Sequence, residues 1–412
     1  MPKRETAARA EIAQRVVYWR KRRGLTRQLF ADRMGRSVSW IDMIQRGDRQ
    51  LDRLSVLEQI AGVLEISIYT LIDQRQAQRA AECIDDTEVR ILKEALQRYD
   101  CITHTFGSDK PPKEADLSPL TQQVDYAWLA FQSSHYSTLG PLLGRLLIAA
   151  QQASIQLDGD AQRIALELLA QVYQITTSTL RKLGHHDLEW LAAERGVMAA
   201  ERTENPVLIG GAAFRLVNAL RATDGAAAAV DAATASAHRL QPTLDVEEAE
   251  PTSLLGMLYL QGAVSAALKA DPQRTQDLLD EAARLAQRLG GDRNDYWTAF
   301  GPTNVDIHRV AAYVALRDWP AAVHVAERMN QYNLSLLPKE RRANYHVDVA
   351  RAYALGAKTS EAITRLLQAD SLAPKEVRCR PVARDLVHDL WRSQRATSSG
   401  LQKLVEQMGL AT

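Results

Sequence analysis

A dense group of arginines lies near the start of the chain, and the chemistry that arginine clusters offer is phosphate binding. Residues 1–75 contain 15 Lys or Arg and 9 Asp or Glu, which gives this segment a net charge of +6. The remaining residues carry a net charge of −5. A basic segment on a mildly acidic body is typical of proteins that hold nucleic acid at one end. Chance clustering of charge is the alternative.

Other residues that could signal catalysis or metal binding lack the spacing that such chemistry needs. The sequence has no phosphate loop, no glycine-rich dinucleotide turn and no nucleophile elbow, and the pair Gly210-Gly211 alone indicates none of them. His185 and His186 are adjacent on a predicted turn and cannot easily face one ion, and the three cysteines lack metal-ligand spacing. We therefore expect no enzyme activity, no cofactor and no metal site.

The arginines lie among short predicted helices that tight turns separate. Gly24 ends the first helix, and Thr26 is a good N-cap for the second. Gly35 supplies a sharp turn, and Ser37 caps a third helix. Five helices are expected, at about residues 9–23, 26–34, 37–47, 53–64 and 68–72.

Two short helices joined by a glycine-containing turn, inside a five-helix unit, are typical of a helix-turn-helix. A resemblance to the Cro and phage-repressor type of domain, often called Xre-type, lies in RKRRGLTRQLFADRMGRSVSWIDMIQRGDRQ and the following LSVLEQIAGVLEISIYTL. It covers residues 9–72 and implies that the chain binds double-stranded operator DNA. We expect this DNA-binding domain to occupy residues 1–75.

The resemblance implies that the third helix lies in the major groove of DNA. Its base-reading positions hold Val38, Ser39 and Met43, with Asp42 beside them. The family usually has Gln, Arg or Lys there, which can bond two atoms of one base edge, whereas Val38 and Met43 can contact only a thymine methyl group. Recognition of DNA shape, aided by flanking arginines, is the alternative.

Ser37, Trp40 and several arginines complete the expected DNA-binding surface. Trp40 is unusual where the family has a small polar residue, and it either fills core space or presses against the sugar-phosphate backbone. Arg27 stands at a helix N-terminus, where backbone N–H groups also favour phosphate. The resemblance implies phosphate contacts for the other arginines, and the alternative is a solvated face. These others are Arg46, Arg49 and Arg53.

Residues 76–119 change character and are expected to form a linker. A helix is predicted over about residues 86–106. The stretch GSDKPPKEADLSP that follows has the composition of a loop.

From residue 120 to residue 412 every segment is predicted to be helical, and the helices come in pairs. The clearest unit is YHVDVARAYALGAKTSEAITRLLQADSLAP, which resembles a tetratricopeptide repeat at Ala350, Tyr353, Ala362, Ala369 and Pro374. The resemblance implies a right-handed solenoid whose concave face, lined by the first helix of each pair, binds ligands. The expected fold class is all-α, with a five-helix helix-turn-helix domain followed by this solenoid. Further pairs are expected at about residues 121–155, 160–203 and 206–240.

Polar and aromatic residues are candidates for that concave face. Asn304 and Asn344 stand near the start of the first helix in the two best repeats, and asparagine can bond a peptide backbone as both donor and acceptor. The aromatic residues of NDYWTAFGPTNVDIH could wall a pocket. Ordinary packing and helix capping between repeats are the alternative. The full candidate set is Arg215, Asn218, Tyr296, Phe300, Asn304, His308, Asn344, Asp348 and Arg351.

The combination of such a head and body resembles pheromone-responsive regulators of Gram-positive bacteria and related actinobacterial regulators. It implies a homodimeric transcription regulator, as in quorum sensing, in which a short peptide or small molecule in the groove alters operator binding. The chain has no apolar run near the roughly 20 residues of a membrane span and no apolar signal core, so we expect a cytoplasmic protein. Two alternatives stay open: a DNA-tethered adaptor whose repeats bind a protein partner, and a head whose DNA affinity is vestigial.

Overall fold

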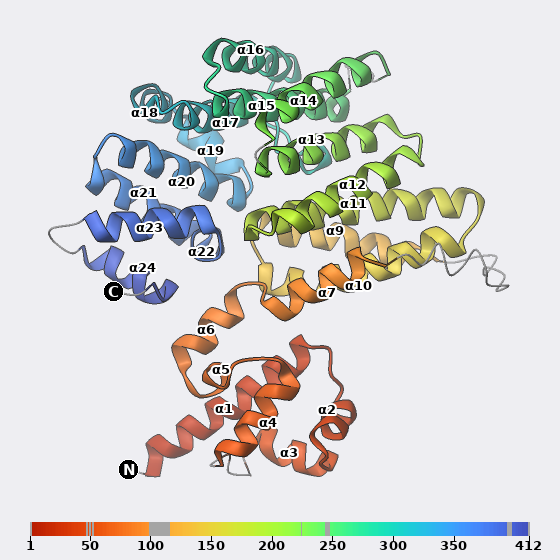
Figure 1. Ribbon diagram of the computed structural model, residues 1–412, viewed down its shortest axis with the longest axis vertical. Helices are drawn as coiled ribbons and strands as arrows, with labels where there is room; N and C mark the ends of the chain where they lie inside the picture. Colours follow the sequence, from red (N-terminus) through yellow and green to blue (C-terminus); the bar gives the residue numbers. More distant parts are fainter. Residues whose placement is uncertain are drawn as a thin grey trace. The chain divides into compact units, whose positions relative to one another are not determined.

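The computed structural model describes residues 2–410 except 47, 49–50, 52, 99–115, 224, 244–247 and 394–397. Over this part of the chain the regular structure is helical throughout, without a strand, as the expected all-α class requires. Two compact units form, Met1–Ile91 with Ser137–Pro141 and Leu92–Tyr136 with Leu142–Thr412 (Figure 1). None of the described helices combines the length and the apolar character that crossing a bilayer demands.

Among the described residues, the first unit contains the five helices that the sequence predicted, the further helix α6, and the first part of α7, which the sequence predicted in the linker. The helix α1 begins before the apolar periodicity does, because the preceding charged residues and alanines are good helix formers. The helix predicted to reach residue 106 is shorter, since it ends at Leu96, and residues 99–115 lie outside the described residues. The bounds are α1 (Pro2–Arg22), α2 (Arg27–Met34), α3 (Val38–Arg46), α4 (Leu54–Leu64), α5 (Ile68–Ile72), α6 (Gln74–Glu82) and α7 (Asp86–Leu96).

The connection between α2 and α3 is fixed by the caps that the sequence predicted. The Thr26 hydroxyl accepts a hydrogen bond from the Leu29 N–H at 3.1 Å, which starts α2. Gly35 ends α2 with a φ of 61°, a left-handed conformation that favours glycine. The Ser37 hydroxyl then accepts a hydrogen bond from the Trp40 N–H at 3.2 Å. Two helices joined by a tight glycine turn are therefore present.

A buried arginine attaches α1 to α6 and α7, so the first unit extends past the predicted boundary at residue 75. The Arg22 guanidinium forms two hydrogen bonds with the Glu88 carboxylate, at 2.7 and 2.8 Å, and donates to three backbone carbonyls within residues 80–83. Both side chains are almost completely buried. Burial disfavours the charged guanidinium, but the bonds to Glu88 outweigh it and raise the pKa of Arg22. The three helices therefore fold as one body.

The second unit is a stack of helices in which predicted pairs appear as α11–α12, α13–α14, α15–α16, α17–α18 and α20–α21, whereas α9 packs on α11. Short 3-10 helices, η1 (Gln241–Thr243) and η2 (Asp295–Trp297), lie in two of the connections. The bounds are α9 (Ser118–Gln132), α10 (Tyr136–Gln156), α11 (Gly159–Leu183), α12 (His186–Glu201), α13 (Pro206–Ala222), α14 (Ala226–Leu240), α15 (Ala249–Leu268), α16 (Pro272–Leu289), α17 (Pro302–Ala315), α18 (Trp319–Glu327), α19 (Gln331–Leu336), α20 (Lys339–Leu355), α21 (Thr359–Leu372), α22 (Pro374–Arg378), α23 (Pro381–Ser393) and α24 (Ser399–Met408).

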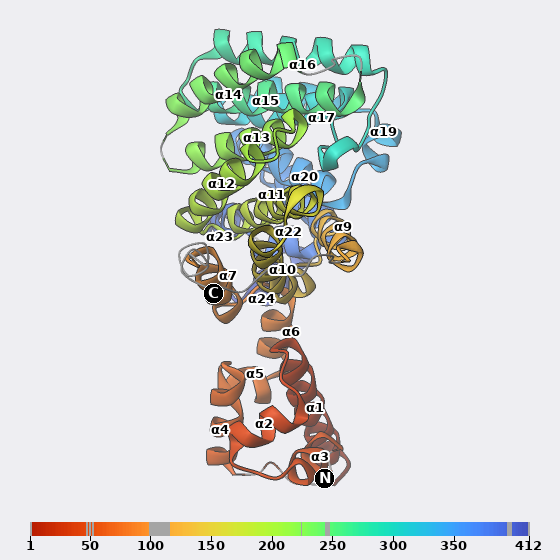
Figure 2. The ribbon, with the colours of Figure 1, turned by 90° about the vertical axis from the view of Figure 1, so that its right-hand side faces the viewer.

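An inner row of helices runs through this stack. From α11 to α18 each helix packs on the next, and α11, α13, α15, α17 and α20 also contact one another in turn (Figures 1 and 2). Buried alanines such as Ala229, Ala233 and Ala237 keep neighbouring helices close. First helices that contact first helices are the arrangement of repeat proteins. The tetratricopeptide assignment and the right-handed sense of the stack stay predictions.

Candidate functional site

The helix α3 separates a buried face from a face that solvent reaches. Trp40, Ile41 and Ile44 are buried in the core of the first unit. Side chains on the other face follow one another at helical spacing, as a helix that enters a DNA groove requires. These are Ser39 and Arg46, which are exposed, and Asp42 and Met43, which are half-buried.

Trp40 fills the core of the first unit. Its side chain is only 8% exposed and packs in the same apolar cluster as Phe30 and Ile41. The Arg36 guanidinium lies 5.4 Å from the centre of the Trp40 ring. Of the two roles predicted for Trp40, burial therefore favours core packing over contact with the DNA backbone. Val38 also packs partly against this core, which leaves less of it for a thymine methyl group.

The predicted phosphate-binding arginines that the structure describes are Arg27, Arg46 and Arg53, and all three are exposed. Arg27 Nη1 lies 3.3 Å from the Asp42 carboxylate, and Arg46 Nε lies 3.1 Å from the Asp48 carboxylate. Exposed ion pairs of this kind are weak, so a DNA phosphate can replace the carboxylate at little cost.

Four further residues complete the description of this surface. Ser37 is exposed, but its hydroxyl already caps α3. Arg49 lies outside the described residues. Sequence reasoning missed Arg36 in the turn before α3 and Gln28 in the first turn of α2, both of which are exposed. A basic residue directly after the turn glycine was the signal for Arg36.

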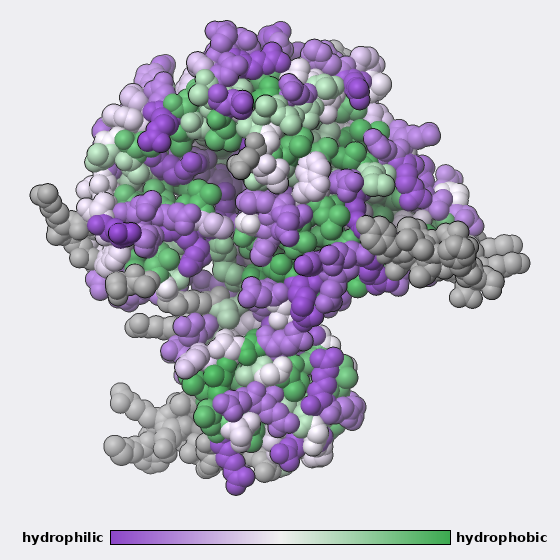
Figure 3. Space-filling model, viewed as in Figure 1, coloured by the Kyte–Doolittle hydropathy of each residue, from purple (hydrophilic) through white to green (hydrophobic). Residues whose placement is uncertain are grey.

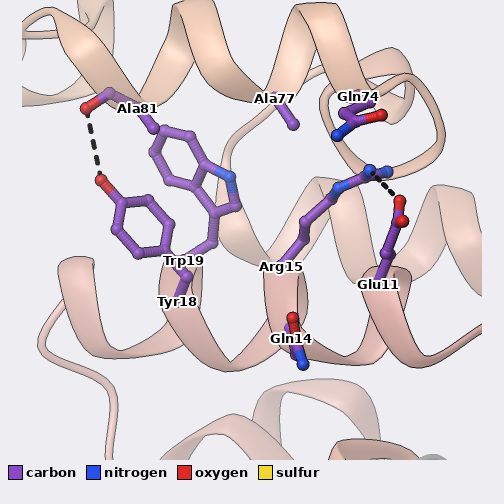
Figure 4. A pocket seen from close by; sticks show the side chains of 8 residues that line it. All are labelled: Glu11, Gln14, Arg15, Tyr18, Trp19, Gln74, Ala77 and Ala81. Carbon is purple, nitrogen blue, oxygen red and sulfur yellow. Dashed lines mark hydrogen bonds and ion pairs between the residues drawn. The ribbon is translucent and has the colours of Figure 1, made fainter.

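A shallow groove lies between α1 and α6 in the first unit (Figure 4). Arg15 donates a hydrogen bond to the Leu71 carbonyl at 2.7 Å and pairs with Glu11 at 2.9 Å. The Tyr18 hydroxyl donates to the Ala81 carbonyl at 3.4 Å. These polar groups join α1 to the helices that follow it, so the groove is a packing seam.

The inner row of the second unit surrounds a cavity of about 340 Å³. Side chains from α11, α13, α15, α17 and α20 line it, so it lies on the face that was predicted to hold a ligand. The surface of this unit is hollowed near its middle, and hydrophilic residues gather there (Figure 3). Four of the predicted ligand-binding residues line the cavity, namely His308, Asn344, Asp348 and Arg351.

Three predicted ligand-binding residues, Phe300, Asn304 and Asn218, serve the interior instead. Phe300 is fully buried, and a Cβ atom on Gly256 would lie 1.9 Å from its ring, so Phe300 is core and not a pocket wall. Asn304 is also fully buried, and its amide points at Met257 Sδ, 3.6 Å away. Asn218 accepts a hydrogen bond at 2.6 Å from Arg221, a residue of the cavity, and thereby orients it.

Arg215 and Tyr296, the other two candidates, belong to an aromatic cluster behind the cavity lining. The Arg215 guanidinium lies 4.8 Å from the centre of the Trp128 ring, which stacks on Trp297 at 5.9 Å. The Tyr296 ring packs where Gly211 has no side chain, since a Cβ atom there would lie 2.5 Å from it. Tyr296 and Trp297 both have a positive φ, 50° and 59°, a strained backbone that this packing holds in place. Both candidates therefore position the segment before α17.

Sequence reasoning missed most of the charged residues that line the cavity. Arg181 and Arg221 stand near the C-terminal ends of α11 and α13, and each follows a leucine. An alignment of the two helices would show this shared Leu-Arg pair, and this was a signal for both arginines. Arg341 precedes Asn344 by three residues and so lies on the same face of α20. The remaining charged residues of the lining are Glu340 and Arg380.

His308 is held neutral at the cavity wall. Its Nδ1 lies 2.9 Å from the Asn304 carbonyl oxygen, and its Nε2 lies 3.2 Å from the Gln261 amide nitrogen. The proton therefore sits on Nδ1, and Nε2 accepts from the amide. Burial, together with the positive charge of Arg341, lowers the pKa of His308 to about 3. At neutral pH His308 contributes shape and hydrogen bonding but no charge.

A buried ion network joins early and late parts of the second unit beside the cavity. Lys182 of α11 lies 2.8 Å from the Glu376 carboxylate of α22 and also bonds the Glu340 carboxylate of α20. Burial opposes ionisation of Glu340, but the charges of Lys182 and Arg341 outweigh it and lower its pKa to about 2. The Tyr136 hydroxyl donates a further hydrogen bond to Glu376. This network fixes Glu340 and hence one wall of the cavity.

A metal-binding cluster would be a further kind of site on these surfaces. In the part of the chain that the structure describes, no three His, Cys, Asp or Glu side chains are placed to hold a metal ion together. Asp348 of the cavity pairs with Arg351, Glu340 pairs with Lys182, and His308 is kept neutral.

Comparison with known proteins finds a similarity over a limited part of the chain. It is 25% identical over 85 residues to the HTH-type transcriptional regulator SinR of Bacillus subtilis (strain 168), and 24% identical over 85 residues to SinR of Bacillus licheniformis. Each match covers 21% of this chain and 77% of the relative. No family model and no solved structure matches the chain. The similarity supports a regulator of the helix-turn-helix type, and most of the chain lies outside it.

Proposed function

We propose that the chain is a sequence-specific DNA-binding transcriptional regulator whose helical-repeat domain binds a signalling ligand that alters operator binding. The observation that carries the DNA-binding part is the pair α2 and α3, with Ser39, Arg27 and Arg46 exposed around a tight glycine turn. The similarity to regulators named as HTH-type supports the same conclusion. The cavity of the second unit supports ligand binding, since four residues chosen from the sequence line it.

In this proposal α3 enters the major groove of an operator. Ser39 and Met43 meet base edges, while Arg27, Arg46 and Arg53 neutralise phosphates and set the register of the helix on the duplex. Two copies of the chain bind two half-sites about one helical turn apart, as helix-turn-helix dimers do. The dimer and the operator belong to the proposal.

The ligand acts by shifting a population between two arrangements of the protein. A ligand that binds one arrangement more tightly favours it, and operator affinity changes if the two arrangements differ in DNA binding. The cavity of about 340 Å³ lies within the range of small-molecule sites, about 300 to 1,000 Å³. A stable protein partner would instead need roughly 800 Å² of surface on each side. The cavity therefore favours a small ligand or a peptide end over an adaptor role.

The DNA-binding part is tested with the full-length protein and duplexes that it selects from genomic fragments. Fluorescence anisotropy at several salt concentrations gives the affinity and its salt dependence. We expect Arg46→Ala to weaken binding to all sequences and to lower the salt slope by about 1. Asp42→Asn removes a negative charge and frees Arg27, so it strengthens binding.

The matched control is Arg239→Ala on the exposed side of α14, which we expect to leave DNA binding unchanged. Equal affinity for the selected and scrambled duplexes at every salt concentration would contradict sequence-specific recognition. Unchanged operator binding in the presence of a low-mass fraction of cell extract, tested across candidate peptides and metabolites, would contradict the ligand switch.

A further inference from the structure

We propose that the cavity of the second unit takes a small molecule that carries an oxyanion, either phosphate or carboxylate, and that Arg181, Arg221 and Arg341 bind this group. The inference rests on the proposed function, because it names the ligand chemistry of the same cavity. It depends on Arg181, Arg221 and Arg341, which the sequence candidates for ligand binding do not include.

Positive charge exceeds negative charge around the cavity. Its lining contains five arginines but only two acidic side chains, Glu340 and Asp348. Asp348 is engaged by Arg351 at 3.0 Å. Glu340 is engaged by Lys182 and by the Asn344 amide. The closest partners of these two acids are therefore Arg351, Lys182 and Asn344, and of the three arginines only Arg341 approaches one of them, at 4.0 Å.

The three arginines lack a close carboxylate partner. Arg221 donates to the Gln261 side chain at 3.0 Å and to Asn218 at 2.6 Å, both of which are uncharged. The Arg181 side chain forms no hydrogen bond or ion pair with any residue that the structure describes. Arg341 Nε is buried without a hydrogen-bond partner, and its nearest carboxylate, on Glu340, lies 4.0 Å away. A buried donor without an acceptor destabilises the fold, so a ligand that supplies an acceptor to Arg341 Nε would be bound favourably.

The three charges also act on one another and on their surroundings. Burial lowers the pKa of Arg181, and the charges of Arg380 and Arg341 lower it further, although Glu189 opposes them. Burial and then the charge of Arg181 lower the pKa of Arg221 to about 10. An oxyanion between these guanidinium groups would remove the repulsion and accept their N–H groups, often two from a single arginine. The neighbouring His308 is neutral and adds no competing charge.

The position of the arginines inside the cavity excludes one source of an oxyanion, the phosphates of a DNA duplex. They line a cavity between the five inner helices and the start of α23, where a DNA duplex, which needs a long open surface, does not fit. A phosphate ester, a free carboxylate of a metabolite and the C-terminal carboxylate of a short peptide share the chemistry that the arginines recognise. The test therefore uses one probe for each source.

The experiment is titration calorimetry and thermal unfolding of the full-length protein. The probes are pyrophosphate, citrate, and trialanine with either a free or an amidated C-terminus, each against sodium chloride of equal ionic strength. We expect at least one oxyanion probe to bind once per chain and to raise the unfolding temperature beyond the salt control. Arg181→Gln and Arg221→Gln should each weaken that binding by about tenfold or more, since each removes charge-assisted hydrogen bonds. Arg239→Gln is the matched control and should bind as the unaltered chain does.

A second readout separates a binding role from a structural role. Without any probe, Arg181→Gln should be about as stable as the unaltered chain, because it removes repulsion from Arg380 and Arg341 together with attraction to Glu189 and Glu340. Three outcomes would overturn the inference. The first is a clear loss of stability of Arg181→Gln without a probe, which would mean that Arg181 supports the fold. The others are probe binding by Arg181→Gln equal to that of the unaltered chain, and the absence of stabilisation by every oxyanion probe. Oxyanion binding that leaves operator affinity unchanged would instead refute the switch of the proposed function and leave this inference standing.

Discussion

Replacing Lys182 by methionine tests whether the buried ion network holds the cavity wall. Lys182 is 1% exposed, and its ammonium group lies between the Glu340 and Glu376 carboxylates, which are 6% and 0% exposed. Methionine fills similar space but leaves two carboxylates without their shared cation. Removal of one partner of a buried ion pair costs about 3 to 5 kcal/mol. The charge of Lys182 is the largest favourable influence that lowers the pKa of Glu340, so the ionised carboxylate depends on this cation.

The assay is urea unfolding at pH 7 and pH 5, with Lys403→Met on the exposed side of α24 as the matched control. At pH 7 we expect the Lys182→Met chain to lose about 3 kcal/mol or more, and the control to lose almost nothing. Without the cation the folded pKa of one carboxyl rises above its unfolded value, so protonation at low pH relieves the penalty. The deficit should therefore shrink at pH 5. A loss below about 1 kcal/mol, or a deficit that is equal at both pH values, would refute this account.

Three further changes probe other parts of the structure. Arg22→Met should destabilise the first unit by about 3 to 5 kcal/mol in urea unfolding, because it strands Glu88, and adding Glu88→Gln should recover part of that loss. Gly256→Ala should cost about 1 to 3 kcal/mol, since the new Cβ atom would lie 1.9 Å from the Phe300 ring, and adding Phe300→Leu should restore stability if this clash is the cause. Between pH 6.5 and pH 5, His308 alone should lower the free energy of unfolding by about 2 kcal/mol. The reason is that the imidazole binds a proton in the unfolded chain but not in the folded chain, where its pKa is about 3. The His308→Gln chain should therefore show a flatter dependence of stability on pH.

The local features of the first unit could be predicted because local chemistry determines them. Thr26, Gly35 and Ser37 define where α2 and α3 begin and end, and each acts on residues within three or four positions of itself. The attachment of α6 and α7 could not be predicted in this way. It depends on Arg22 meeting Glu88, 66 residues later, and nothing in the spacing of charges indicates which acid a buried arginine will find.

The candidate site shows the same division between local and distant information. His308, Asn344 and Arg351 line the cavity, and their inward position could be predicted because helical register indicates which face of a helix turns inward; ligand binding by them stays a prediction. Phe300 was misplaced because the decisive residue, Gly256, is on another helix and makes room for the ring by having no side chain. Arg181 was missed because its place in the lining depends on arginines 40 or more residues later in the chain, Arg221 and Arg341, that reach the same cavity.

The burial of Trp40 changes what the head can contribute to recognition. With Trp40 in the core and Val38 partly against it, the face of α3 that can meet bases is reduced largely to Ser39, Met43 and the acidic Asp42. A serine hydroxyl can pair with either a donor or an acceptor, and a methionine reads only apolar surface, so neither distinguishes bases strongly. The arginines around them add affinity that depends on salt but little on sequence. Discrimination in the proposed regulator must therefore come from DNA shape and from the spacing of two heads, and anything that changes that spacing changes specificity directly. A weakly discriminating head thus gives a ligand in the second unit more control over operator choice than a strongly discriminating one would.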